Sequence, residues 1–293
     1  MIKRTKGEKI FNALNLVLLG IIGVLCLYPM LYVLFASLSE SNKLMAHEGL
    51  LLKPIGFTIA SYKKVISNQM IGIGYKNTLF VLVVGVGVNM VFTTLGAYFL
   101  SRKDVLFKNI IMGIIIFTMY FSGGLIPTYM VVRSIGLDNS LFALILPVAV
   151  STYNMIIMRS GFAAVPESMH EAATVDGANE LTILFRVYLP LIKATFAVIV
   201  LYYAVTNWNS WFSAAIYLKD REKFPLQLVL REILISNDVN AMNDASGSAA
   251  DTESVAMSIK YATIMVATLP ILVVYPFLQK YFVGGVMIGS VKG

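Results

Sequence analysis

Six long stretches of this chain carry no charged side chain, and they constrain its fold more than any other feature. About 20 apolar residues cross a hydrocarbon core about 30 Å thick, so each stretch is long enough to span a membrane. Leu, Ile, Phe and Val each favour the bilayer centre by about 0.3–0.6 kcal/mol, so such stretches insert readily. The sequence therefore predicts an all-α, polytopic membrane protein with six transmembrane helices. The stretches cover residues 13–36, 77–100, 109–132, 140–158, 194–218 and 261–279.

Two alternative interpretations of these stretches are less favourable. Buried helices of a soluble protein would come with roughly a quarter charged residues, whereas this chain has 13%. A basic lead (Lys3, Arg4, Lys6 and Lys9) before residues 13–36 is compatible with a signal peptide. The apolar region of a signal peptide is only about 7–15 residues long, however, so 13–36 is interpreted as an uncleaved first span.

Lysine and arginine in the short connections predict the orientation of the spans, because such residues gather on the cytoplasmic side. Connection 101–108 holds Arg102, Lys103 and Lys108, whereas 133–139 holds only Arg133. Both termini are therefore expected in the cytoplasm, with the chain crossing the membrane several times. The expected organisation is a cytoplasmic segment 1–12, a six-span transmembrane domain 13–282 and a cytoplasmic tail 283–293. Within the domain, loop 160–190 lies inside and loop 219–260 outside.

The spans contain no Asp, Glu, Lys, Arg or His. Proton-coupled carriers and intramembrane enzymes place ionisable groups there, so both classes are disfavoured, while a sodium-coupled secondary carrier using backbone carbonyls remains the alternative. Cys26 is interpreted as a packing residue, and His47 and His170 fall on opposite sides of the membrane, so no metal site is expected. The sequence also lacks a phosphate-binding loop. If the chain pumps a solute, a partner must supply the energy, and the chain would not be an enzyme by itself.

The polar segment 166–190 interrupts the apolar chain in the cytoplasmic loop. Pro166 suits the first turn of a helix, and Gly177 is a natural stop after a helical run from Met169 to Asp176. Asn179 can cap a second helix. In that helix the apolar residues share one face by their i, i+3, i+4 and i+7 spacing. They are Leu181, Leu184, Phe185 and Tyr188.

Two short helices joined by a tight turn are thus expected outside the bilayer. An amphipathic helix resting on the membrane surface is the alternative, but such helices usually carry Lys and Arg on their polar face. The first helix instead has Glu167, Glu171 and Asp176 and no basic residue. Small residues at Ala172, Ala173 and Gly177 would let another chain approach the backbone closely. This composition favours a protein partner.

The segment resembles the EAA loop of membrane subunits of binding-protein-dependent ABC importers. The pattern EAA-x-x-DGA followed by F-x-x-x-LP is met at Glu171, Ala172, Ala173, Asp176, Gly177, Ala178, Phe185, Leu189 and Pro190. Residues 121–147, 207–212, 224–234 and 289–293 are similar to the MalG-like subset that takes up oligosaccharides and polysaccharides. The resemblance covers almost the whole chain.

This resemblance implies that 13–282 is a permease domain in the bacterial inner membrane. In the implied assembly, ATP and Mg are bound by two ATPase subunits and no cofactor by this chain. The other implied partners are a homologous second membrane subunit, an extracytoplasmic solute-binding protein and the lipid bilayer; no nucleic acid is expected. Glu171 would meet basic or polar groups of an ATPase, Gly177 would allow the sharp turn, and Phe185 and Leu189 would join the coupling helices to the spans. The cargo would be an oligosaccharide or polysaccharide, with acidic ones such as alginate or pectin fragments included.

Aromatic and amide side chains within the spans are candidates for the cargo pathway, because sugars bind through ring faces and hydrogen bonds. For the tryptophans, an interfacial aromatic belt is the alternative. The deeply placed Asn154 needs a partner, because an unpaired amide in hydrocarbon costs several kcal/mol. The candidates are Tyr120, Tyr153, Asn154, Asn207, Trp208, Asn209 and Trp211.

The loop 219–260 divides into two parts. Residues 225–235 are expected to form an amphipathic helix, and 237–254 are polar and small, suited either to contact with a binding protein or to a simple connector.

Overall fold

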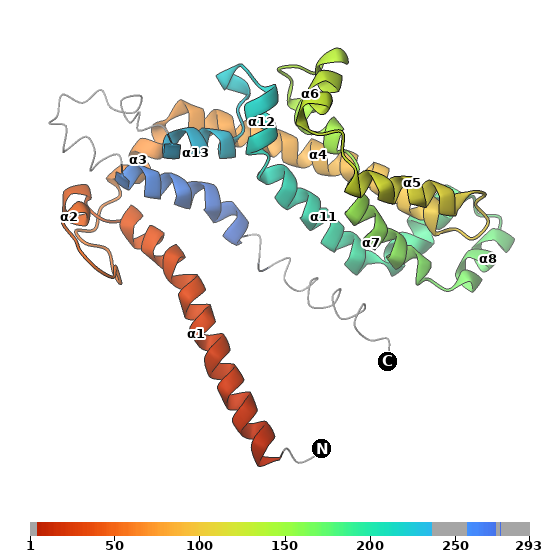
Figure 1. Ribbon diagram of the computed structural model, residues 1–293, viewed down its shortest axis with the longest axis horizontal. Helices are drawn as coiled ribbons and strands as arrows, with labels where there is room; N and C mark the ends of the chain where they lie inside the picture. Colours follow the sequence, from red (N-terminus) through yellow and green to blue (C-terminus); the bar gives the residue numbers. More distant parts are fainter. Residues whose placement is uncertain (1–4, 236–256, 274–275, 277–293) are drawn as a thin grey trace. The chain divides into compact units, whose positions relative to one another are not determined.

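The computed structural model of the chain describes residues 5–235, 257–273 and 276 and divides into two compact units. The first unit takes Met1–Gln69 and Glu232–Leu269, and the second takes Met70–Arg231 and Pro270–Gly293. Every element in the described part is helical (Figure 1). The cytoplasmic tail expected at 283–293 and the polar stretch 237–254 lie outside the described residues.

The first unit is dominated by helix α1 (Lys6–Ser37). Thr5 and Glu8 form a reciprocal capping box at its start, which satisfies two backbone N–H groups. None of its apolar window is buried within the protein, as expected for a helix that is hydrophobic on all sides and faces lipid or another subunit. The helix is therefore suited to cross a membrane.

The last turns of α1 are covered by the connection that contains α2 (Ser41–Met45) and leads to α3 (Ala60–Ser67). Ala36, Leu44 and Leu51 form a small buried core there. The Ser39 hydroxyl accepts a hydrogen bond from the Ile55 amide at 2.9 Å, and Ser37 bonds the Tyr62 hydroxyl at 2.7 Å. This long connection is therefore an ordered cap on the helix rather than a loose loop.

The second unit is built around α4 (Gln69–Ser101), whose residues from Met70 onward belong to it. Helix α7 (Thr152–Ala163) packs against both α5 (Lys108–Tyr120) and α11 (Lys193–Trp208). The apolar core of the unit includes Tyr98, Met158, Phe162, Leu184 and Ile199, all buried. It joins the end of α4 to α7, to the start of α11 and to the segment between them.

Three of the expected spans are bent or broken. Between α5 and α6 (Leu125–Ser134) the chain turns by 113°, where Gly124 adopts a φ of 84° that disfavours other residues. Residues 140–158 start as two short 3₁₀ helices, η1 (Leu141–Leu144) and η2 (Leu146–Val148), and bend by 51° into α7. Charge-free composition predicts membrane residence, but it does not detect such breaks.

The stretch 194–218 is also divided, into α11 and α12 (Trp211–Tyr217), with η4 (Arg221–Lys223) and α13 (Leu226–Ile235) following. Helix α13 is the one expected at 225–235. By length and composition, two described helices can each cross a membrane, or up to five if each bent pair is one span. Of the expected span 261–279, only the part within helix Met257–Val273 and residue 276 is described. The described residues therefore do not provide six continuous spans.

Polar side chains within the second unit form hydrogen bonds with the backbone groups that the break before α7 leaves unpaired. Asn89 donates to the carbonyl oxygens of Val148 at 2.9 Å and Ala149 at 3.0 Å, and its own oxygen accepts from Asn207 at 3.0 Å. The Tyr203 hydroxyl bonds Thr93 at 2.6 Å and accepts from the Ser151 amide at 2.9 Å. Backbone groups in hydrocarbon must find partners inside the protein. We refer to Asn89, Thr93, Tyr203 and Asn207 as the neutral network.

Candidate coupling site

The EAA segment folds as a helix, a tight turn and a second helix. Helix α8 (Glu167–Val175) has Pro166 as its N-cap, one residue before the helix rather than within its first turn. Gly177 lies at φ 78°, and the amides of Gly177 and Ala178 donate to the Thr174 and Ala173 carbonyls, both at 3.0 Å. This is a Schellman C-cap, for which glycine is the preferred residue. The turn expected from the sequence is present.

The second helix is irregular. Asn179 caps α9 (Glu180–Ile183) by accepting from the Thr182 amide at 2.8 Å, and a π-helical turn, η3 (Leu184–Tyr188), then leads to α10 (Leu189–Leu191). The extra residue in a π turn rotates the side chains that follow it. Leu184 and Tyr188 are buried, but Leu181 and Phe185 are 59% and 58% exposed. The single apolar face expected for these four residues is therefore split.

The EAA residues form an exposed surface on the two helices. Ala173 and Leu189 are half-buried against the core of the unit. Among the described residues, the carboxylates of Glu171 and Asp176 form no hydrogen bond or ion pair, whereas the acidic groups on the inner side of the segment are paired. The exposed members are Glu171, Ala172, Asp176, Gly177, Phe185 and Pro190.

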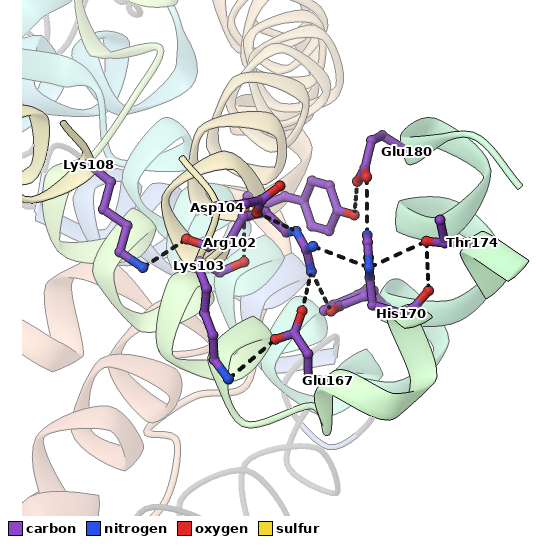
Figure 2. Close-up of polar contacts among 11 residues, drawn as sticks. Arg102, Lys103, Asp104, Lys108, Glu167, His170, Thr174 and Glu180 are labelled. Atoms are coloured by element: carbon purple, nitrogen blue, oxygen red, sulfur yellow. Dashed lines mark hydrogen bonds and ion pairs between the residues drawn. The ribbon is translucent and has the colours of Figure 1, made fainter. Parts of the chain in front are cut away.

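Behind this surface, Arg102 ties the end of α4 to the EAA segment (Figure 2). Its side chain is 10% exposed, and its Nη1 donates to Glu167 Oε1 at 3.1 Å and to the Tyr188 hydroxyl at 3.3 Å. Its Nη2 lies 3.2 Å from His170 Nδ1. Three elements, α8, η3 and the α4 end, thus meet on one guanidinium.

Glu180, at the start of α9, completes the cluster. Its two carboxylate oxygens accept from the Tyr98 hydroxyl at 2.6 Å and bond His170 Nε2 at 3.1 Å. We refer to Tyr98, Arg102, Glu167, His170, Glu180 and Tyr188 as the coupling network. Its hydrogen bonds join residues of α4 and of the following connection to residues more than 60 positions away in sequence.

The electrostatics of the coupling network keep its ionised groups charged. The hydrogen bond from Tyr98 holds the pKa of Glu180 below its ordinary value against the opposing effect of burial, and His170 adds to the lowering. Burial acts to lower the pKa of Arg102, but Asp104, Tyr188 and Glu167 outweigh it, so that pKa is raised. An ionised carboxylate and a guanidinium each make stronger hydrogen bonds than neutral groups do.

Sequence reasoning did not find the coupling network. It used Arg102 only as an orientation signal and considered His170 only as a metal ligand, for which it found no partner. Among the described residues no group of three potential metal-ligating side chains gathers. The available signal was an arginine directly after a charge-free stretch, matched by acidic residues and a histidine in the next cytoplasmic loop.

The pathway candidates fall into two groups. Tyr153, Asn154, Asn207 and Trp208 line one cavity of about 900 Å³ in the second unit, between α4, α7 and α11. Asn154 is buried, and the indole N–H of Trp208 has no partner among the described residues.

The remaining candidates, Tyr120, Asn209 and Trp211, are not among the residues that line this cavity. Tyr120 is exposed at the end of α5. Asn209 donates to the Val205 carbonyl of its own helix at 2.8 Å, and the Trp211 ring lies 3.8 Å beneath the Arg231 guanidinium.

Comparison with known proteins gives the family. A family model described as the binding-protein-dependent transport system inner membrane component matches residues 9–287. The chain belongs to this family. Its members are permease components, so this chain is a multi-pass, helical inner-membrane subunit and not itself a catalytic one, as the sequence predicted; no cofactor is expected in it.

Individual relatives of the permease cover it almost completely. Protein LplC of Bacillus subtilis (strain 168) is 41% identical over 290 residues, which cover 99% of this chain and 97% of that protein. The polygalacturonan/rhamnogalacturonan transport system permease protein YtcP of the same organism is 39% identical over 286 residues, covering 98% and 99%.

The fold of the permease matches a solved structure. A chain in the crystal structure of a bacterial ABC transporter involved in the import of the acidic polysaccharide alginate has a TM-score of 0.86 to this chain at 33% identity. The match covers 96% of this chain and 100% of that one. The resemblance to ABC importer permeases of the carbohydrate-uptake type is therefore confirmed.

Proposed function

We propose that this permease forms half of the translocation pathway of an ATP-driven importer for acidic oligosaccharides or polysaccharide fragments. The cargo class is supported by two relatives, one named for polygalacturonan and rhamnogalacturonan and one involved in alginate import. A different, homologous membrane subunit supplies the other half, and an extracytoplasmic binding protein delivers the cargo. The chain crosses the membrane six times with both termini in the cytoplasm.

The exposed EAA residues, here called the EAA surface, form the contact through which two ATPase subunits move the permease. The observation that carries this proposal is the contrast between its two sides. Its outer side offers exposed Glu171 and Asp176 with exposed apolar Phe185. Its inner side is held to the end of α4 by partly buried hydrogen bonds and an ion pair. A helix pair that is fixed to α4 on its inner side and has unpaired carboxylates on its outer side can transmit a rigid-body rotation from a bound partner to the membrane helices.

The cavity between α4, α7 and α11 serves as part of the cargo pathway. Tyr153 offers an exposed ring, Asn154 offers a side-chain amide, and the indole N–H of Trp208 has no partner among the described residues. Hydroxyl-rich cargo needs such groups, because sugars present C–H faces to aromatic rings and hydroxyls to amides. Tyr120, Asn209 and Trp211 are proposed for the outer mouth of the pathway.

Reconstitution tests the function. The permease, its companion membrane subunit, the ATPase and the binding protein are placed in liposomes, and uptake of trigalacturonate and of an alginate trisaccharide is measured. We expect uptake of at least one that requires both ATP and the binding protein. Uptake driven by a sodium gradient without ATP would overturn the proposal.

A substitution at Gly177 tests the coupling role of the EAA surface. Gly177→Asp places a charged side chain at the Schellman turn and should abolish uptake while the subunit still accumulates in the membrane. Gly136→Asp is the matched control, because Gly136 also has a positive φ, of 76°, but lies in the connection after α6. Normal uptake by Gly177→Asp would remove the coupling role from this surface.

A further inference from the structure

His170 occupies the centre of the coupling network. The residue is 8% exposed. Its two ring nitrogens face groups from two other elements, with Nδ1 3.2 Å from Arg102 Nη2 and Nε2 3.1 Å from Glu180 Oε1 (Figure 2). The imidazole is therefore a bridge between the end of α4 and the start of α9.

The partners determine the protonation of the ring. A guanidinium can only donate hydrogen bonds, so Nδ1 must accept from Arg102. A carboxylate can only accept, so Nε2 must carry the hydrogen that Glu180 receives. The Thr174 hydroxyl, 3.5 Å from Nδ1, gives its own hydrogen to the His170 carbonyl at 2.9 Å. The bridge thus requires a neutral imidazole in one tautomer.

We infer that neutral His170 is a positioning residue that fastens the EAA helices to α4, so that movement of these helices is passed to α4 as well as to α11. This inference rests on the proposed coupling function. Helix α11 follows the EAA segment directly along the chain, at Ile192. Among the described residues, side chains at the end of α4 also contact the segment directly, Tyr98 through Glu180 and Arg102 through Glu167. His170 adds the contact that connects Arg102 with Glu180.

A proton on Nδ1 would break the bridge on one side. It would set an N–H against the donor of Arg102, while the bond to Glu180 would be kept and strengthened. The groups that face or surround the ring are Arg102, Glu180, Thr174 and Tyr188, with Glu167 and Asp104 acting through Arg102 and Tyr98 through Glu180. Acid should therefore loosen α4 from the coupling helices without removing their contact with an ATPase.

The test compares two substitutions in the full importer in liposomes, with trigalacturonate as the probe. His170→Gln keeps an acceptor and a donor but cannot be protonated, and His170→Leu keeps neither. The measurement is cargo imported per ATP hydrolysed, together with the amount of assembled complex. We expect His170→Leu to lower this ratio by roughly five- to tenfold and His170→Gln to restore most of it. His47→Gln, at the other histidine, should leave the ratio unchanged.

A pH series keeps the inference testable if His170→Leu does not assemble. When the pH is lowered from about 7.5 to about 5.5, the wild-type ratio should fall and that of His170→Gln should stay level, because a histidine side chain can accept a proton and a glutamine side chain cannot. A parallel fall in both proteins would overturn the inference, as would an unchanged ratio in assembled His170→Leu. If the wild-type complex imports neither trigalacturonate nor an alginate trisaccharide with ATP, it is the proposed function that fails.

Discussion

The two polar networks of the second unit do similar mechanical work with different chemical groups. The neutral network joins α4 to α7 and α11 through amides and hydroxyls alone. The coupling network joins the end of α4 to α8, α9 and η3 through a guanidinium, carboxylates and an imidazole. An ionised side chain is expensive inside hydrocarbon but affordable near water. The kind of polar group thus marks where along α4 the membrane ends.

The comparison also separates what each network holds in place. The neutral network satisfies backbone groups freed by a broken helix, so its loss should cost folding stability. The coupling network links side chains of helices that are already capped and complete, so its loss should cost transmission of movement more than stability. Single substitutions in the two networks can test whether one contributes mainly to folding stability and the other mainly to transmission of movement.

The largest loss of folding stability is expected on substitution of Asn89. Asn89→Leu leaves the Val148 and Ala149 carbonyls and the Asn207 amide without their partner, at a cost of at least about 2 kcal/mol, because each buried group loses its hydrogen bond. The measurement is thermal unfolding of the purified complex in detergent. Asn209→Leu is the control, since Asn209 is exposed and bonds only its own helix. Equal melting of the two variants would contradict the role of the neutral network.

A smaller effect is expected at Tyr203. Tyr203→Phe removes one hydroxyl that bonds both Thr93 and the Ser151 amide, and leaves the ring packed in the core. The expected loss is about 1–2 kcal/mol of unfolding free energy. Tyr153→Phe should cost almost nothing, because Tyr153 is 54% exposed. If the Tyr203 variant unfolds at the wild-type temperature, the break before α7 does not depend on this hydroxyl.

These two positions also show how far the sequence could predict the fold. Local rules gave the helix stop at Gly177 and the cap at Asn179, because both depend on a few neighbouring residues. The bends within 109–132 and 140–158 were not predicted, because hydropathy reports residence in the membrane and not continuity of a helix. Asn89 and Tyr203 read as ordinary residues of an apolar stretch until the broken segment is placed beside them.

The candidate site was predictable to a similar extent. The exposed EAA residues could be predicted from the sequence pattern, because they all lie on the surface of one short segment. The π turn that exposes Phe185 depends on how Leu184 and Tyr188 pack into the core of the unit. The coupling network could not be predicted from local spacing, because Arg102 contacts Glu167 and His170, which lie 65 and 68 positions further along the chain.

The contribution of Glu180 to folding stability should be lost only at acidic pH. The pKa of Glu180 is lowered in the folded chain, so its contribution to stability is complete above its ordinary value of 4.5 and is lost as the pH falls through the lowered value. Glu180→Gln should remove this contribution, so stability near neutral pH falls slightly and its dependence on pH below about 4.5 weakens; the effect is small because the Glu180 side chain is 60% exposed. Unfolding midpoints measured across that range, with Glu48→Gln at an exposed position outside the network as the control, check the sign. A variant that loses as much stability at neutral pH as Asn89→Leu would erase the distinction between the networks.

The smallest effect on the isolated subunit is expected at Glu171, on the outer side of the coupling helices. The side chain has no ion pair among the described residues, so Glu171→Gln and Glu171→Lys should unfold like the wild type. Co-purification with the ATPase should fall severalfold for the lysine variant and less for glutamine, because exposed ion pairs contribute about 0.2–1 kcal/mol and reversal adds repulsion. High salt should reduce the difference between wild type and Glu171→Gln, since it screens exposed charges. Unchanged co-purification of Glu171→Lys would mean that the acidic groups of the EAA surface do not contact the ATPase, and the contrast between its anchored inner side and its unpaired outer side would lose its functional meaning.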